Sequence, residues 1–144
     1  MNKQRGFTLI ELVVVIIILG VLAAVAVPKF TDMSNDARTA ATKGVAAAIS
    51  SGSSINYAAR QAGSANAVVV NGANVCDVAT LGNFVVTGAG GVTLYAAAPA
   101  SPGDSDYVVS GNGACNGAQT TASCTVQAAK GAASSATAAV FCAR

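Results

Sequence analysis

The chain has 144 residues, of which 53% are hydrophobic and only 10% are charged, and its formal net charge is +2. A charge so close to zero gives no broad basic surface of the kind that binds nucleic acid. The chain contains no histidine, so it lacks the usual general base at neutral pH and a common zinc ligand. We therefore expect a structural protein that consists of one domain and an anchoring segment, with no enzyme activity, metal or cofactor.

A short polar leader precedes one long apolar run. Residues 1–6, MNKQRG, include Lys3 and Arg5, whereas residues 7–27 have only Thr8 and Glu11 as polar side chains. At a rise of about 1.5 Å per residue, a helix of this run would be about 32 Å long, close to the thickness of a bilayer's hydrocarbon core. The run therefore predicts a membrane-spanning helix, with the basic leader kept in the cytoplasm.

Glu11 is the unusual residue of the apolar run. A carboxylate at the centre of a membrane helix costs about 3 kcal/mol on insertion scales, so such a residue usually has a function. Glu11 lies near the amino end of the run, where lipid headgroups lower that cost. A tolerated interfacial glutamate is therefore the alternative to a functional one.

The residues around Glu11 resemble a known leader. Gly6 is followed by Phe7 and then TLIEL, behind a basic leader and ahead of an unbroken apolar helix, which resembles the class III leader of type IV pilins and their relatives. The resemblance implies that a prepilin peptidase cuts between Gly6 and Phe7 and that Phe7 becomes N-methylated. It also implies that Gly20 and Pro28 weaken the helix, and we predict partial unwinding between them in an assembled filament.

Cleavage gives Glu11 a physical role. It exposes an α-amine at Phe7, which the Glu11 carboxylate of an adjacent subunit could neutralise, because an unpaired buried charge is costly. We therefore predict that Glu11 sets the register of subunits in a helical filament. Loss of the leader also leaves six acidic and six basic side chains, so the mature chain has no net charge.

The helical pattern continues from Pro28 to Ala62, and Gly63 is a plausible stop. One predicted face carries mostly small apolar residues at three- and four-residue steps: Phe30, Met33, Ala37, Ala41, Val45, Ala48, Gly52, Ile55, Ala59 and Ala62. The other side is polar, with Asp32, Asp36, Arg38, Lys43 and Arg60. Lys29, Arg38, Lys43 and Arg60 are interpreted as a solvated face in preference to a DNA-binding one.

Residues 63–144 predict a β-sheet head. Six β-prone runs alternate with glycine-rich turns, at residues 67–70, 83–87, 92–96, 107–110, 123–128 and 136–142. We predict an antiparallel sheet of about four main strands covered by the second half of the helix, hence an α+β fold. Asp104 and Asp106 lie in a turn and are interpreted as solvated in preference to a calcium site.

Four cysteines fall in the exported part, where disulfides persist, and three pairings are possible. A hairpin around Lys130-Gly131 would bring Cys124 near Cys142. The family resemblance likewise implies a loop closed by the last two cysteines, which leaves Cys76 with Cys115. The pairing of Cys76 with Cys124 and of Cys115 with Cys142 remains open.

The predicted organisation is a cleaved leader at 1–6, a membrane and filament-core helix at 7–27, its amphipathic continuation at 28–62 and a disulfide-stapled head at 63–144. The resemblance implies a type IV pilus subunit, which is held in the bacterial inner membrane as a precursor and then polymerises with itself into a surface filament. Its partners would be the peptidase, the assembly machinery, and surfaces or DNA. The alternatives are a type II secretion pseudopilin and a minor pilin that binds a ligand such as DNA.

Overall fold

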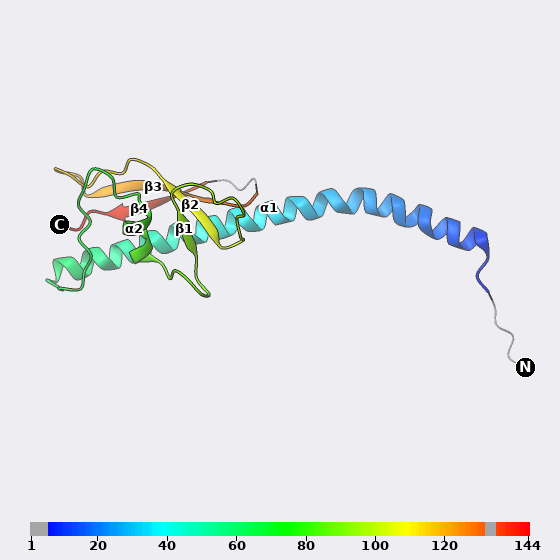
Figure 1. The fold of residues 1–144 in the computed structure, drawn as a ribbon, viewed down its shortest axis with the longest axis horizontal. Helices are drawn as coiled ribbons and strands as arrows, with labels where there is room; N and C mark the ends of the chain where they lie inside the picture. Colours follow the sequence, from blue (N-terminus) through cyan, green and yellow to red (C-terminus); the bar gives the residue numbers. More distant parts are fainter. Residues whose placement is uncertain (1–5, 132–134) are drawn as a thin grey trace, which may run out of the picture. The chain divides into compact units, whose positions relative to one another are not determined.

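The structure is a computed structural model that describes residues 6–131 and 135–144. Residues 1–5, which contain the predicted basic leader charges Lys3 and Arg5, lie outside the described residues. The chain divides into two compact units, Met1–Ser34 and Asn35–Arg144. The first contains only helix and the residues before it, and the second contains the remaining helix with the sheet (Figure 1).

Helix α1 runs from Leu9 to Gln61 without a break. It begins two residues after the predicted start and ends one residue before the predicted end. Gly63 has a φ of +76°, and its amide donates to the Arg60 carbonyl while the Ser64 amide donates to the Ala59 carbonyl. These two bonds form a Schellman motif, so the predicted glycine stop is confirmed.

The sheet has four strands in the order β1-β2-β3-β4, with β1 at Thr93–Tyr95, β2 at Asp106–Ser110, β3 at Thr121–Ala128 and β4 at Ala136–Phe141. The pairs β2–β3 and β3–β4 are antiparallel, whereas β1 and β2 are parallel. The predicted α+β class is thus confirmed, but the sheet is mixed. Residues 96–105 join β1 to β2 and bring the chain back to the end of the sheet at which β1 begins, so that the two strands run parallel. A tight hairpin turn cannot make this connection.

Two of the expected strands are not strands. Residues 67–70 contribute only an isolated bridge between Val70 and Ala143. The region 83–87 begins inside a 3-10 turn, η1 at Gly82–Phe84, which comes directly after a short helix, α2 at Val78–Leu81, and only Thr87 forms an isolated bridge, with Val92. Asp77 starts that helix because its carboxylate accepts hydrogen bonds from the amide of Thr80 at 2.9 Å and from its hydroxyl at 2.8 Å.

The preferred disulfide pairing is wrong, and the alternative left open is the one found. Cys76 is bonded to Cys124, and Cys115 is bonded to Cys142. The strand register gives the reason, since Cys124 pairs with Ala138 and not with Cys142. Cys142 lies four residues further along, where its amide donates to Thr120, and cannot reach Cys124 across the hairpin.

The hydrophobic core lies between the sheet and the second half of α1. Its largest fully buried apolar side chains are Ile49, Val70, Leu81, Val126 and Val140, and all four cysteines are buried with them. Several other core positions are alanines, which bury little surface each: Ala46, Ala122, Ala128, Ala138 and Ala143. The two disulfides therefore reinforce a core of small side chains.

Candidate assembly surface

The first turn of α1 holds the predicted assembly residue Glu11. Thr8 precedes the helix, and both its amide and its hydroxyl donate to Glu11 Oε2, at 2.8 and 2.7 Å. The Glu11 amide in turn donates to the Thr8 hydroxyl at 3.4 Å. This reciprocal arrangement is a capping box, which satisfies backbone donors that a helix start otherwise leaves unpaired.

Sequence reasoning missed Thr8 as a partner of Glu11. The signal was present, because a threonine followed three residues later by a glutamate and an apolar run is the pattern of a capping box. Phe7, where the predicted new amino terminus would lie, is 86% exposed immediately before this turn. Glu11 Oε2 is therefore hydrogen-bonded within its own chain, four residues after Phe7 in the sequence.

The amino-terminal half of α1 is long and apolar enough to cross a membrane, judged by length and composition. Among the residues that the structure describes, none of the side chains of this half is buried. The helix also remains continuous through Gly20 and Pro28, although Pro28 has no amide to donate. So large an apolar surface calls for lipid or other helices around it.

Beyond residue 35, the most deeply buried face of α1 is displaced from the predicted one, although Val45 and Gly52 of the predicted stripe are half-buried. The fully buried helix positions are Thr42, Ala46, Ile49 and Ser53, about one residue around the helix from the predicted stripe. Polar groups make much of this contact, because the Ser50 and Ser53 hydroxyls accept from the Ala139 and Phe141 amides of β4 at 2.9 and 2.7 Å. The free edge of β4, which a further strand would otherwise cover, is thus capped by helix hydroxyls.

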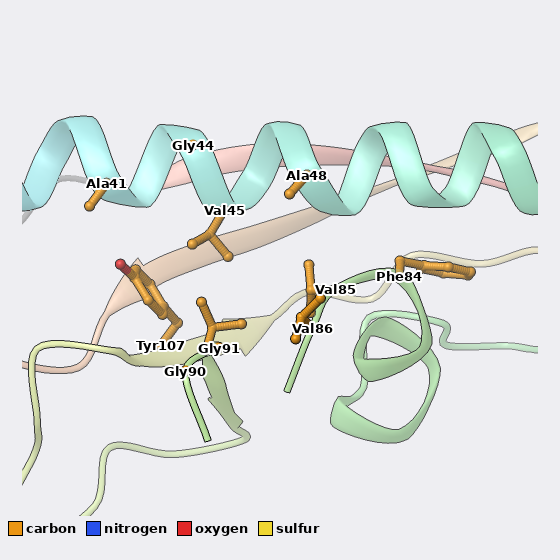
Figure 2. A pocket seen from close by; sticks show the side chains of 11 residues that line it. Ala41, Gly44, Val45, Ala48, Phe84, Val85, Val86, Gly90, Gly91 and Tyr107 are labelled. Carbon is orange, nitrogen blue, oxygen red and sulfur yellow. The ribbon is translucent and has the colours of Figure 1, made fainter. Parts of the chain in front are cut away.

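Part of the predicted apolar face borders an open groove instead. This groove has a volume of about 540 Å³ and lies between α1 and the segment before β1. Figure 2 shows Ala41, Val45 and Ala48 of the helix facing Val86 and the Gly90-Gly91 turn across it. No charged side chain lines the groove.

Two of the four basic helix residues contact the head and are not simply solvated. Arg38 Nη2 lies 3.1 Å from Asp104 Oδ1, and its Nη1 donates to the Lys130 carbonyl. Arg60 donates to the carbonyl of Arg144 at 3.0 Å. A continuous DNA-binding stripe is therefore not supported by this geometry.

The predicted turn carboxylates also have protein partners. Asp104 Oδ1 bridges Arg38 and Lys130, each at 3.1 Å, and Asp106 accepts from the Gly103 amide at 2.8 Å. The hydrogen bond and positive charge of Lys130, with a smaller effect of Arg38, lower the pKa of Asp104 from its ordinary value. Within residues 6–131 and 135–144, no cluster of acidic, cysteine or histidine side chains is placed to hold a metal.

Comparison with known proteins finds similarity in the amino-terminal part of the chain. The prokaryotic N-terminal methylation motif matches residues 1–27, a stretch that contains Gly6, Phe7 and Glu11. A type IV narrow pilus major component, PilA5 of Thermus thermophilus, is 49% identical over 49 residues, which are 34% of this chain and 42% of the relative. The matches support a type IV pilin.

Other relatives match this chain over a similarly short stretch. The type IV major alpha-pilin of Moraxella bovis is 50% identical over 48 residues, which are 33% of this chain and 30% of that protein. The type II secretion system core protein G of Pseudomonas aeruginosa is 46% identical over 43 residues, 30% of each chain. The chain thus matches less than half the length of these curated relatives, and no solved structure gives a significant match.

Proposed function

We propose that this chain is a structural subunit of a type IV pilus. The methylation motif, joined to an apolar helix that no described residue covers, is the observation that carries the proposal. The precursor sits in the inner membrane through residues 7–27, prepilin peptidase removes residues 1–6 after Gly6, and Phe7 is N-methylated. The assembly machinery then polymerises the chain into a helical surface filament.

In the filament, residues 7–27 form the core, residues 28–62 continue the helix, and residues 63–144 face outward for contact with surfaces or DNA. Helix packing replaces lipid contact, and small residues let neighbouring helices approach closely: Gly20, Ala23, Ala24 and Ala26.

Because Pro28 leaves one carbonyl without its helical donor, the Gly20–Pro28 segment is expected to unwind partly after assembly. Continuous helical density there in a filament map would contradict this expectation.

Glu11 is the residue whose change should separate membrane insertion from assembly. In the filament its carboxylate neutralises the Phe7 amine of a neighbouring copy, so Glu11→Gln should leave the membrane pool intact and sharply reduce the yield of sheared filament. Asp32→Asn is the matched control, since it removes a carboxylate from an exposed part of the same helix. Equal filament yields from the two variants would argue against the role of Glu11.

The direct test is electron microscopy of material sheared from cells, with intact-mass analysis of its main protein. We expect long filaments built from a chain that begins at methylated Phe7 and is lighter by four hydrogens for two disulfides. A chain that keeps residues 1–6 in its functional form would overturn the proposal.

A second candidate is a pseudopilin of a type II secretion system, which the match to the core protein G favours. A third is a minor pilin that binds a ligand such as DNA. In either case the chain would be processed but would stay in the envelope or form only a small fraction of shed filaments. The same shearing experiment therefore separates these candidates from the major subunit.

A further inference from the structure

Three asparagines of the head are followed directly by glycine: Asn71, Asn112 and Asn116. Such a pair is chemically reactive, because glycine has no side chain to keep its amide nitrogen away from the side-chain carbonyl carbon of the preceding asparagine. All three asparagines are exposed to solvent. The three pairs differ in how firmly the surrounding fold holds their backbone.

The backbone around Asn71 and Gly72 is fixed on both sides. Val70 exchanges two hydrogen bonds with Ala143, and the Gly72 carbonyl accepts from the Cys115 amide at 2.8 Å. Turning the peptide between Asn71 and Gly72 would require these bonds to break. The fold therefore opposes attack of the Gly72 amide on the Asn71 side chain.

The glycine after Asn112 is held more tightly still. Gly113 is buried, its carbonyl accepts from the Val75 amide at 2.7 Å, and a Cβ added to it would lie 2.6 Å from the Cys76 sulfur. Its backbone is thus packed against the disulfide between Cys76 and Cys124. Solvent base has little access to an amide in this position.

The turn at Asn116 and Gly117 has none of these restraints. Both residues are exposed, as are the three residues that follow them, and Gly117 has a φ of +65°. In the part of the chain that the structure describes, no hydrogen bond holds the Asn116 side chain or the Gly117 amide. The two groups can therefore approach one another without loss of a native contact.

We propose that Asn116 is a site of spontaneous deamidation, with the Gly117 amide as the nucleophile. The Gly117 nitrogen loses its proton to solvent base and bonds to Cγ of Asn116, and the side-chain nitrogen leaves that carbon as ammonia. Water then opens the cyclic imide at either carbonyl, which gives aspartate or, where the main chain is opened, isoaspartate. One water is consumed and no oxidant or cofactor is needed.

The product places a new carboxylate on the exposed surface of the head. A single negative charge is large for this chain, whose formal net charge would fall from +2 to +1. The reaction does not depend on filament formation, so its test is independent of the proposed function.

Peptide mapping by mass spectrometry of the full chain, incubated in detergent micelles at mildly alkaline pH, measures the reaction at each site. In the folded chain we expect Asn116 to lose its amide about tenfold or more faster than Asn71 and Asn112, because those two sites must wait for local opening. In the reduced and denatured chain the three sites should react at similar rates, since each precedes glycine. Equal rates in the folded chain, or an unchanged preference for Asn116 after denaturation, would overturn the inference.

A variant of the nucleophile tests the chemistry. Gly117→Ala should slow the loss of the Asn116 amide about tenfold or more, because a Cβ hinders the attack and disfavours the positive φ of this residue. Ala118→Gly is the matched control, since Ala118 lies in the same exposed turn but its amide takes no part, and it should react as the unmodified chain does. Unslowed reaction of Gly117→Ala, or a product without isoaspartate, would contradict the cyclic imide.

Discussion

Gly52 shows how a single residue sets the distance between α1 and the head. A Cβ added at Gly52 would lie 2.4 Å from the carbonyl oxygen of Phe84 and 2.9 Å from the Cβ of Phe84. Only glycine therefore allows the helix to contact the η1 turn this closely. Gly44, two turns earlier on the same helix, has no atom within 4 Å of such a Cβ.

Gly52→Ala should destabilise the protein by about 1–3 kcal/mol, because the turn at Phe84 must move to admit the methyl group. Gly44→Ala, the control, should be neutral or stabilise by up to about 1 kcal/mol through its better helix propensity. Denaturant unfolding of the full chain in detergent micelles measures both. A Gly52→Ala protein as stable as Gly44→Ala would contradict the close contact.

Thr8→Ala should fray the first turn of α1, because it removes the hydroxyl that both donates to Glu11 and accepts from its amide. The expected loss of helix stability is about 1 kcal/mol. Amide hydrogen exchange of the chain in micelles should become faster in this turn. Thr8→Ser, which keeps the hydroxyl, should exchange as the unmodified chain does.

At the scale of elements, α1 takes the place of a strand beside β4. Strand β4 pairs with β3 on one edge only, and the amides of Ala139 and Phe141 on its other edge donate to Ser50 and Ser53. A hydroxyl at the right helix position thus satisfies a backbone donor that the edge of a sheet leaves unpaired. This requirement explains why the helix buries a face that contains serines.

Ser53→Ala should destabilise the head by about 1 kcal/mol, because the partly buried Phe141 amide loses its acceptor. Ser54→Ala is the control, since the Ser54 side chain is exposed and bonds only the Ser51 carbonyl of its own helix. Thermal unfolding and the exchange rate of the Phe141 amide report the difference. Unchanged protection of that amide in Ser53→Ala would count against the capping role.

At the scale of the whole molecule, segments far apart in the sequence are joined by ion pairs and disulfides within the unit of residues 35–144. Asp104 connects Arg38 of α1 with Lys130 of the loop between β3 and β4. The disulfides bridge 48 and 27 positions of the chain, Cys76 to Cys124 and Cys115 to Cys142. Cross-links of this length restrict the unfolded chain and contribute about 2–4 kcal/mol each.

The Asp104 cluster predicts a pH dependence. Its partners lower the pKa of Asp104 below the ordinary 3.8, so the stabilisation is fully present above that pH and is lost as the pH falls through the lowered folded pKa. The effect should be small because the carboxylate is exposed. Comparing thermal unfolding of the unmodified chain and Asp104→Asn across this range tests it, and parallel pH profiles would contradict the assignment.

Local patterns in the sequence determined much of this protein. The apolar run, the 3.6-residue periodicity and Gly63 predicted one long helix and its end, because hydrophobic spacing and a glycine that tolerates positive φ act within a few residues. The three carboxy-terminal strands were found at nearly their observed bounds for the same reason. The motif from Gly6 to Glu11 likewise lies in one short segment, so it was visible before any fold was known.

The tertiary structure alone decided how these elements meet. The disulfide pairing depended on the β3–β4 register, which places Cys124 opposite Ala138, and the parallel β1–β2 pair depended on the path of residues 96–105. The buried helix face depended on which hydroxyls could reach the amides of β4. Periodicity identifies an apolar face but not the surface that covers it, and here the chain's own head covers a neighbouring, more polar face because unpaired sheet amides need acceptors there.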